Sequence, residues 1–190
     1  MRLSTRTLIL AGSATVVLAG MSTVGWAAAS GVFRDAATAP NGQCSAPALS
    51  GTVVDVTLAD VGAMMGGGGM MAGDYAVGGM MRVLASTSQV PAGSVSFRVA
   101  NAGSLVHELV ILPLPAGQAV GERAVSSNSS VDESDSLGEA SRTCGAGAGD
   151  GINPGAIGWV TVNLPVGNYE LICDRPGHYA AGMFSELTVT

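Results

Sequence analysis

Apolar and polar residues alternate with a period of two through much of the chain after residue 51. This is the pattern of strands that bury one face, and no window of about a dozen residues shows a helical period. Turn-forming residues separate several of these stretches, at 91–93, 101–103 and 165–168. The stretches that we expect to form strands are 52–60, 81–87, 95–103, 107–113, 157–164, 169–173 and 183–190.

Short strands with glycine and proline between them predict an all-β fold, an antiparallel β-sandwich. Two insertions interrupt the alternation. Residues 64–81 contain methionine pairs among glycines, and residues 121–151 are rich in serine, glycine and acidic residues. Both compositions are typical of surface loops. Residues 30–50 have no period and predict a linker, so the folded domain should span 51–190.

The N-terminal 29 residues have the layout of an export signal. Arg2 and Arg6 precede an uncharged apolar run, and small residues end at Ala29. An uncleaved membrane anchor is the alternative, because 8–29 reaches the roughly 20 residues that a span needs. Its glycine, serine and threonine would make a weak span, which favours cleavage. Either way the domain should be extracytoplasmic: periplasmic, secreted or held at the cell surface.

The composition of the chain limits the classes of partner that it can bind. The 190-residue chain has a net charge of −6 and no lysine. An acidic chain without a basic patch is a poor binder of nucleic acid. We expect a monomer of one domain, with membrane contact only if the N-terminal segment stays attached.

Three cysteines are an odd number for an exported protein, since oxidising compartments pair cysteines. Cys173 belongs to the motif described next. Cys44 and Cys144 could therefore form a disulfide. It would close a loop of about a hundred residues and stabilise the fold by about 4–5 kcal/mol through chain entropy.

Candidate metal ligands lie near the C-terminus. Cys173, His178 and Met183 have four residues between each and the next. A helix would point residues at this spacing in different directions, and one strand would spread them over about 33 Å. Only a loop that doubles back brings them together, and Pro176 and Gly177 supply a bend.

A thiolate, an imidazole and a thioether form a soft to borderline donor set. Methionine is not a usual zinc ligand, which weighs against a structural zinc site. The set suits copper in the blue-copper arrangement, in which two histidines and one cysteine surround the metal and a methionine binds weakly on the axis. Since the chain has only one other histidine, we predict that one copper ion, cycling between Cu(I) and Cu(II), is bound by His107, Cys173, His178 and Met183.

The chain resembles the cupredoxins, the small blue copper proteins, and within them the plastocyanin and sulfocyanin-like group. Asn-Ala-Gly at 101–103 ahead of His107, and the C-x4-H-x4-M loop, carry the resemblance, which covers 52–190. It implies a Greek-key sandwich with three ligands on the last hairpin loop. It also implies that the backbone N–H of Glu108 donates to the Cys173 sulfur, and that His178 is the surface exit for electrons.

A copper ion held in this way changes oxidation state with little ligand movement, as a one-electron carrier requires. We therefore predict an electron carrier, with donor and acceptor redox proteins docking on a small apolar surface near His178. We do not expect an enzyme, because multicopper oxidases and copper nitrite reductases need further histidines. The alternative is a copper-handling protein, in which thioethers of the 64–81 insertion bind extra Cu(I). Those candidates are Met64, Met65, Met70, Met71 and Met80.

Overall fold

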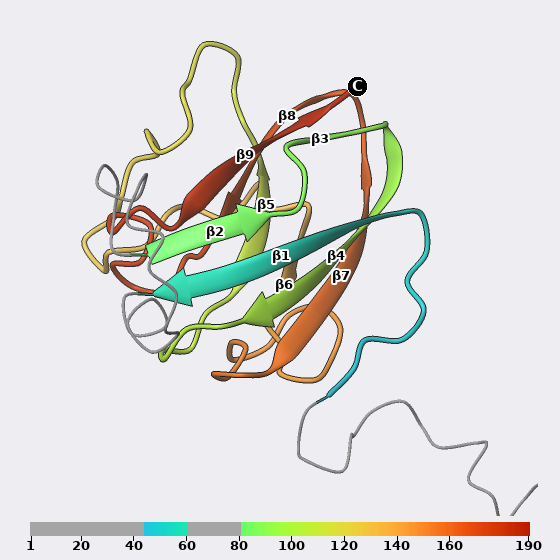
Figure 1. Ribbon diagram of the computed structural model, residues 1–190. Coiled ribbons are helices and arrows are strands. Elements are labelled where there is room, and N and C mark those ends of the chain that lie inside the picture. The colour runs from blue at the N-terminus through green and yellow to red at the C-terminus, as the bar shows by residue number, and fades with distance from the viewer. Residues whose placement is uncertain (1–43, 61–80) are drawn as a thin grey trace, which may run out of the picture. The chain divides into compact units, whose positions relative to one another are not determined.

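The computed structural model describes residues 44–60 and 81–190, which form nine β-strands and no helix (Figure 1). The strands are β1 (Thr52–Asp60), β2 (Met81–Ala85), β3 (Gln89–Val90), β4 (Gly93–Asn101), β5 (Leu109–Pro113), β6 (Gly138–Ala140), β7 (Ile157–Leu164), β8 (Gly167–Ile172) and β9 (Phe184–Val189). All the stretches expected to form strands overlap one of these, so the all-β prediction is confirmed.

The strands form two sheets, in the orders β2-β1-β4-β7 and β3-β9-β8-β5-β6. Most neighbours are antiparallel, but β1 pairs with β4 in parallel, and so does β3 with β9. The β-sandwich prediction is confirmed, and the two parallel pairs make both sheets mixed where antiparallel pairing was expected. Thirty or so residues lie between β1 and β4, enough chain for the crossover that a parallel pair needs.

The hydrophobic core lies between the sheets. Its fully buried side chains include Val54 and Leu58 of β1, Phe97 of β4, and Leu171 of β8. Cys173 and Met183, at opposite ends of the loop between β8 and β9, belong to the same cluster. The core and the candidate metal ligands are therefore continuous.

The second insertion is not entirely a surface loop, which corrects the expectation for 121–151. Gly138–Ala140 form β6 at the edge of a sheet and pair with β5. Ala140 is fully buried and Val131 is 7% exposed. Three residues are too few to show an alternating pattern, and the acidic residues around them hide the strand in the sequence.

Several predictions fall outside the described residues. They are the signal or anchor at 1–29, the linker up to residue 43, and the methionines at 64, 65, 70, 71 and 80. Residues 44–50 have no regular secondary structure, and Met81 begins β2 and packs against the core. Within 44–60 and 81–190, no helix is long and apolar enough to cross a membrane.

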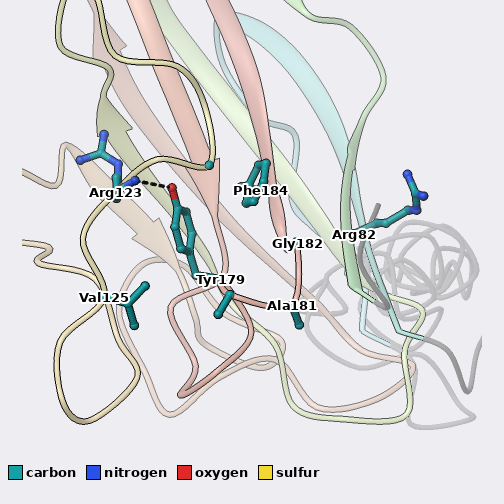
Figure 2. Close-up of a pocket in the computed structure, with 9 residues that line it drawn as sticks. Arg82, Arg123, Val125, Tyr179, Ala181, Gly182 and Phe184 are labelled. Atoms are coloured by element: carbon teal, nitrogen blue, oxygen red, sulfur yellow. Dashed lines mark hydrogen bonds between the residues drawn. The ribbon is translucent and has the colours of Figure 1, made fainter. Parts of the chain in front are cut away.

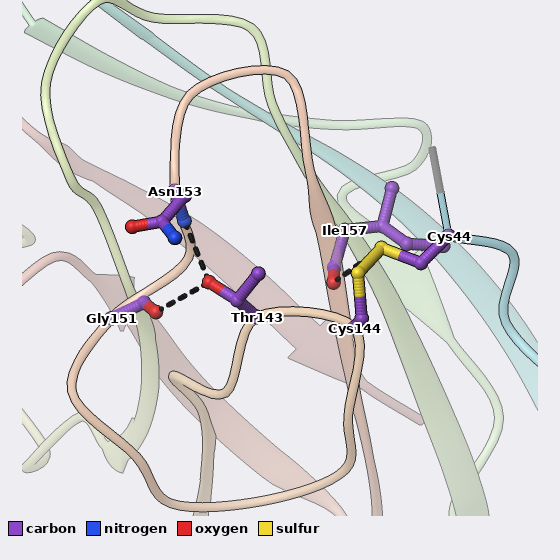
Figure 3. Close-up of a disulfide and its surroundings, with 6 residues drawn as sticks. All are labelled: Cys44, Thr143, Cys144, Gly151, Asn153 and Ile157. Carbon is purple, nitrogen blue, oxygen red and sulfur yellow. Dashed lines mark hydrogen bonds between the residues drawn. A yellow bond between two sulfur atoms is a disulfide. The ribbon is translucent and has the colours of Figure 1, made fainter. Parts of the chain in front are cut away.

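Cys44 and Cys144 form a disulfide, with their Cα atoms 5.3 Å apart (Figure 3). It joins the segment before β1 to the loop before β7. Next to it, the hydroxyl of Thr143 donates to the carbonyl of Gly151 and accepts from the N–H of Asn153. These bonds hold the loop that carries Cys144.

Candidate metal site

Three donor side chains that are far apart in the sequence meet at one end of the core. The Nδ1 atoms of His107 and His178 are 3.1 Å apart. Cys173 Sγ lies 3.4 Å from Nδ1 of His178 and 3.9 Å from Nδ1 of His107. Nitrogen and sulfur ligands sit about 2.0–2.3 Å from a borderline metal such as zinc, so two ligands of one ion lie within about 4–4.6 Å. All three spacings meet this condition, and the cluster can hold one metal ion.

His107 is fully buried just before β5. Its backbone N–H donates to the carbonyl of Ile152, and the N–H of Ile152 donates back to the carbonyl of His107. This two-bond bridge fixes the histidine backbone against the segment before β7. The imidazole is held by the fold and not by a flexible loop.

The loop from Cys173 to Met183 doubles back as the spacing predicted. The backbone N–H of Cys173 donates to the carbonyl of Met183, and the N–H of Met183 donates to the carbonyl of His178. Gly177 has φ +84°, a left-handed conformation that glycine adopts without steric cost. These features bring a turn of the chain, and with it His178, over the buried Cys173.

Met183 is fully buried at the neck of the same loop, where its backbone is hydrogen-bonded to both Cys173 and His178. These bonds hold the backbone of Met183 beside Cys173 and His178. His178 is the partly exposed member of the set, whereas Cys173 and His107 are fully buried. His107, Cys173 and His178 are therefore found at one place, and hydrogen bonds hold the backbone of Met183 beside two of them.

The environment keeps the thiol and the imidazoles of the protein without metal in their neutral forms. Burial raises the pKa of Cys173 to about 12, although backbone N–H groups of Arg175 and Glu108 oppose the rise. The Glu108 N–H donates to Cys173 Sγ over 3.4 Å, which confirms the bond that the family resemblance implied. Burial also lowers the pKa values of His107 and His178 below 6.5.

Asp60, the last residue of β1, is a site residue that the sequence did not reveal. Its Oδ2 lies 3.2 Å from Nε2 of His107, and both side chains are buried. Burial acts to raise the pKa of Asp60, but hydrogen bonds from the backbone N–H groups of Leu105 and Ser104 outweigh it and hold the pKa below its usual range. The only sequence signal was an acidic residue at the end of an alternating strand.

A second group that the sequence did not reveal, the carboxylate of Glu170, holds the ligand loop in place. The buried carboxylate of Glu170 forms an ion pair with Arg123 and accepts a hydrogen bond of 2.8 Å from the hydroxyl of Tyr179, the residue after His178. The Tyr179 hydroxyl in turn accepts from the backbone N–H of Arg123 (Figure 2). The ring of Phe184 packs against Tyr179. The ligand loop is thus fastened to β8 and to the 121–123 segment.

No protein-family profile and no curated protein sequence matches the chain. Solved structures do resemble it. Reduced rusticyanin is 21% identical over 75% of this chain and 82% of its own, with a TM-score of 0.42. Reduced auracyanin from Roseiflexus castenholzii is 19% identical over 75% and 99%, with a TM-score of 0.43. Auracyanin A, a blue copper protein from Chloroflexus aurantiacus, is 17% identical over 73% and 99%, with a TM-score of 0.41.

Proposed function

We propose that this chain is an exported mononuclear blue copper protein of the cupredoxin type, which carries single electrons between redox proteins. The observation that carries the proposal is the meeting of His107 Nδ1, Cys173 Sγ and His178 Nδ1 at 3.1–3.9 Å, with Met183 buried beside them.

The donor set fits copper better than its competitors. One thiolate, two imidazoles and a thioether are the ligands of blue-copper electron-transfer sites. Structural zinc sites are closed by four cysteine or histidine ligands, and this cluster offers three. Oxygen ligands, which calcium and magnesium require, are not part of the cluster. His107, Cys173 and His178 would hold the metal, and Met183 would be its weak fourth ligand.

The surroundings of the ligands suit electron transfer. Copper bound to such a set supplies a one-electron couple between Cu(I) and Cu(II). A carrier needs ligands that hold their places in both oxidation states. Here the two backbone hydrogen bonds with Ile152 fix His107. The hydrogen bond from the N–H of Cys173 to the carbonyl of Met183 fixes the two ends of the ligand loop. The bond between Tyr179 and Glu170 fastens the residue that follows His178. These contacts would hold the ligands in one arrangement in both oxidation states of a bound copper.

His178 is the natural contact point for partners. It is the partly exposed ligand, and the loop around it presents uncharged Pro176 and Ala180 to solvent. Redox proteins that meet briefly use small interfaces of this kind. We infer that an electron donor and an acceptor dock here, outside the cytoplasm, on a monomer.

The proposal is tested by redox titration of protein loaded with copper. We expect one copper per chain and a single reversible one-electron transition in the titration. Cys173→Ser, which is close in size but lacks the thiolate, should lose this redox transition and most of the bound copper. Replacement of both Cys44 and Cys144 by serine, which removes the disulfide without leaving a free thiol, is the control and should keep both. Copper binding that does not depend on Cys173, or a bound copper that cannot be cycled, would contradict the proposal.

A further inference from the structure

The two ring nitrogens of His107 face different chemical groups. Nδ1 lies toward Cys173 Sγ and His178 Nδ1, at 3.9 Å and 3.1 Å. Nε2 lies 3.2 Å from Oδ2 of Asp60. A neutral imidazole carries one N–H, so the nitrogen facing a carboxylate is the natural place for it. The nitrogen that faces the metal site is then left with its lone pair free to bind.

Asp60 is itself held in place before any metal binds. Its Oδ2 accepts hydrogen bonds from the backbone N–H groups of Ser104, at 2.7 Å, and Leu105, at 2.9 Å. Its Oδ1 accepts from the Ser104 hydroxyl at 3.0 Å. Asp60 is only 3% exposed. The carboxylate is therefore oriented and compensated by the loop that leads to His107.

Gly103 supplies independent support, because the contact between Asp60 and His107 requires that it lack a side chain. A Cβ at this position would lie 2.5 Å from Asp60 Oδ2 and 2.7 Å from His107 Nε2. Real Cβ atoms do not come so close, so any larger residue would force the two side chains to shift. Backbone, carboxylate and imidazole thus form one closely packed unit.

We propose that Asp60 is a positioning residue for the metal site. It accepts the Nε2–H of His107, which fixes the ring and the tautomer that binds through Nδ1. Carboxylate partners orient metal-binding histidines in this way and raise their basicity. Resting on the proposed function, the inference also assigns Asp60 an effect on the redox couple. A buried negative charge favours Cu(II) over Cu(I), and so lowers the reduction potential.

Two substitutions separate the positioning of the His107 ring from the effect of the negative charge of Asp60. In Asp60→Asn, the amide oxygen can take the place of Oδ2 and keep the bonds from His107, Ser104 and Leu105, while the charge is lost. Asp60→Leu removes both. Asp55→Asn is the matched control, because Asp55 also belongs to β1 but is exposed and pairs with Arg98. It changes the net charge by the same amount.

The first measurement needs no copper. Long-range proton–nitrogen NMR of the protein without metal reports the tautomer of each of its two histidines, and a His178→Gln variant assigns the signals. We expect His107 to carry its proton on Nε2 in the wild type and in Asp60→Asn, and to populate both tautomers in Asp60→Leu. A wild-type His107 protonated on Nδ1, or unchanged in Asp60→Leu, would overturn the positioning role.

The second measurement is the reduction potential of copper-loaded protein. Asp60→Asn should shift the equilibrium toward Cu(I) at least about tenfold, which is about 59 mV for one electron. Asp55→Asn should leave it within about twofold. Equal effects of the two variants would overturn the electrostatic role. If the wild type binds no copper, the proposed function fails and the effect on potential fails with it, whereas the tautomer measurement still decides the positioning role.

Discussion

Nδ1 of His107 and Nδ1 of His178 lie 3.1 Å apart, although 71 positions separate the two residues in the chain. One histidine is fixed beside a strand and the other stands on the loop between β8 and β9. Since the chain contains no other histidine, both of its imidazole side chains lie at this one site. This meeting with Cys173 supports a single metal site, and the following predictions test how the fold maintains it.

Replacing Glu170 by glutamine should strongly destabilise the protein. The buried carboxylate pairs with Arg123 and accepts from Tyr179, so its neutralisation leaves a poorly compensated charge on a largely buried arginine. Breaking a buried ion pair typically costs about 3–5 kcal/mol. Urea denaturation of the protein without metal measures the loss. Glu186, which is exposed opposite Glu170 on β9, provides the control. Glu186→Gln should change the free energy of unfolding by less than about 0.5 kcal/mol. Equal losses would contradict the account.

Tyr179→Phe tests the hydrogen bonds that join the Glu170–Arg123 ion pair to the ligand loop. The change deletes the hydroxyl that donates to Glu170 and accepts from the Arg123 backbone, while the ring stays packed on Phe184. Leaving buried groups without their partner should cost about 1–3 kcal/mol. Thermal or urea unfolding checks the value. A variant as stable as the wild type would show that the hydroxyl does not hold the loop.

Removal of the disulfide should weaken the fold without destroying the site. Cys44 and Cys144 are 100 positions apart, and a cross-link over so long a loop restricts the unfolded chain considerably. The double serine variant should lose about 2–5 kcal/mol of unfolding free energy and keep its copper. A reductant should lower the stability of the wild type to that of the variant and leave the variant unchanged. Loss of copper binding from the variant would mean that the cross-link also shapes the site.

Loading with Cu(I) at pH 8 should release about one proton per chain. The pKa of Cys173 is raised to about 12, so the thiol holds its proton at this pH and must lose it to bind as thiolate. The pKa values of both imidazoles are lowered below 6.5, so the histidines are already neutral. Affinity should therefore rise about tenfold per pH unit in this range. A pH-stat or an indicator dye measures the proton, and Cys173→Ser should release none.

The methionine insertion can be tested by counting copper. Under the proposed function the wild type holds one copper tightly. Leucine in place of the five methionines at 64, 65, 70, 71 and 80 should not change that number. If the wild type instead takes up further Cu(I) that this variant loses, the protein handles copper, as thioether ligands allow.

Much of the fold and the ligand set could be read from the sequence. Period-two alternation marked the long strands, and the equal spacing of Cys173, His178 and Met183 required a returning loop. The sequence could not show that β1 and β4 run in parallel, because a strand has the same pattern in either direction. It also concealed Asp60 and Glu170. An acidic residue at a strand end or in an alternating strand looks like a solvated one until the fold reveals its partners.

The most direct test of the central claim is the visible absorption spectrum of the oxidised, copper-loaded protein. Ligation of Cu(II) by the Cys173 thiolate, with His107 and His178 as further ligands, would produce an intense blue charge-transfer band. It should be absent from Cys173→Ser and retained when Cys44 and Cys144 are both replaced by serine. A wild type that stays colourless with copper bound, or a band that survives Cys173→Ser, would contradict the account.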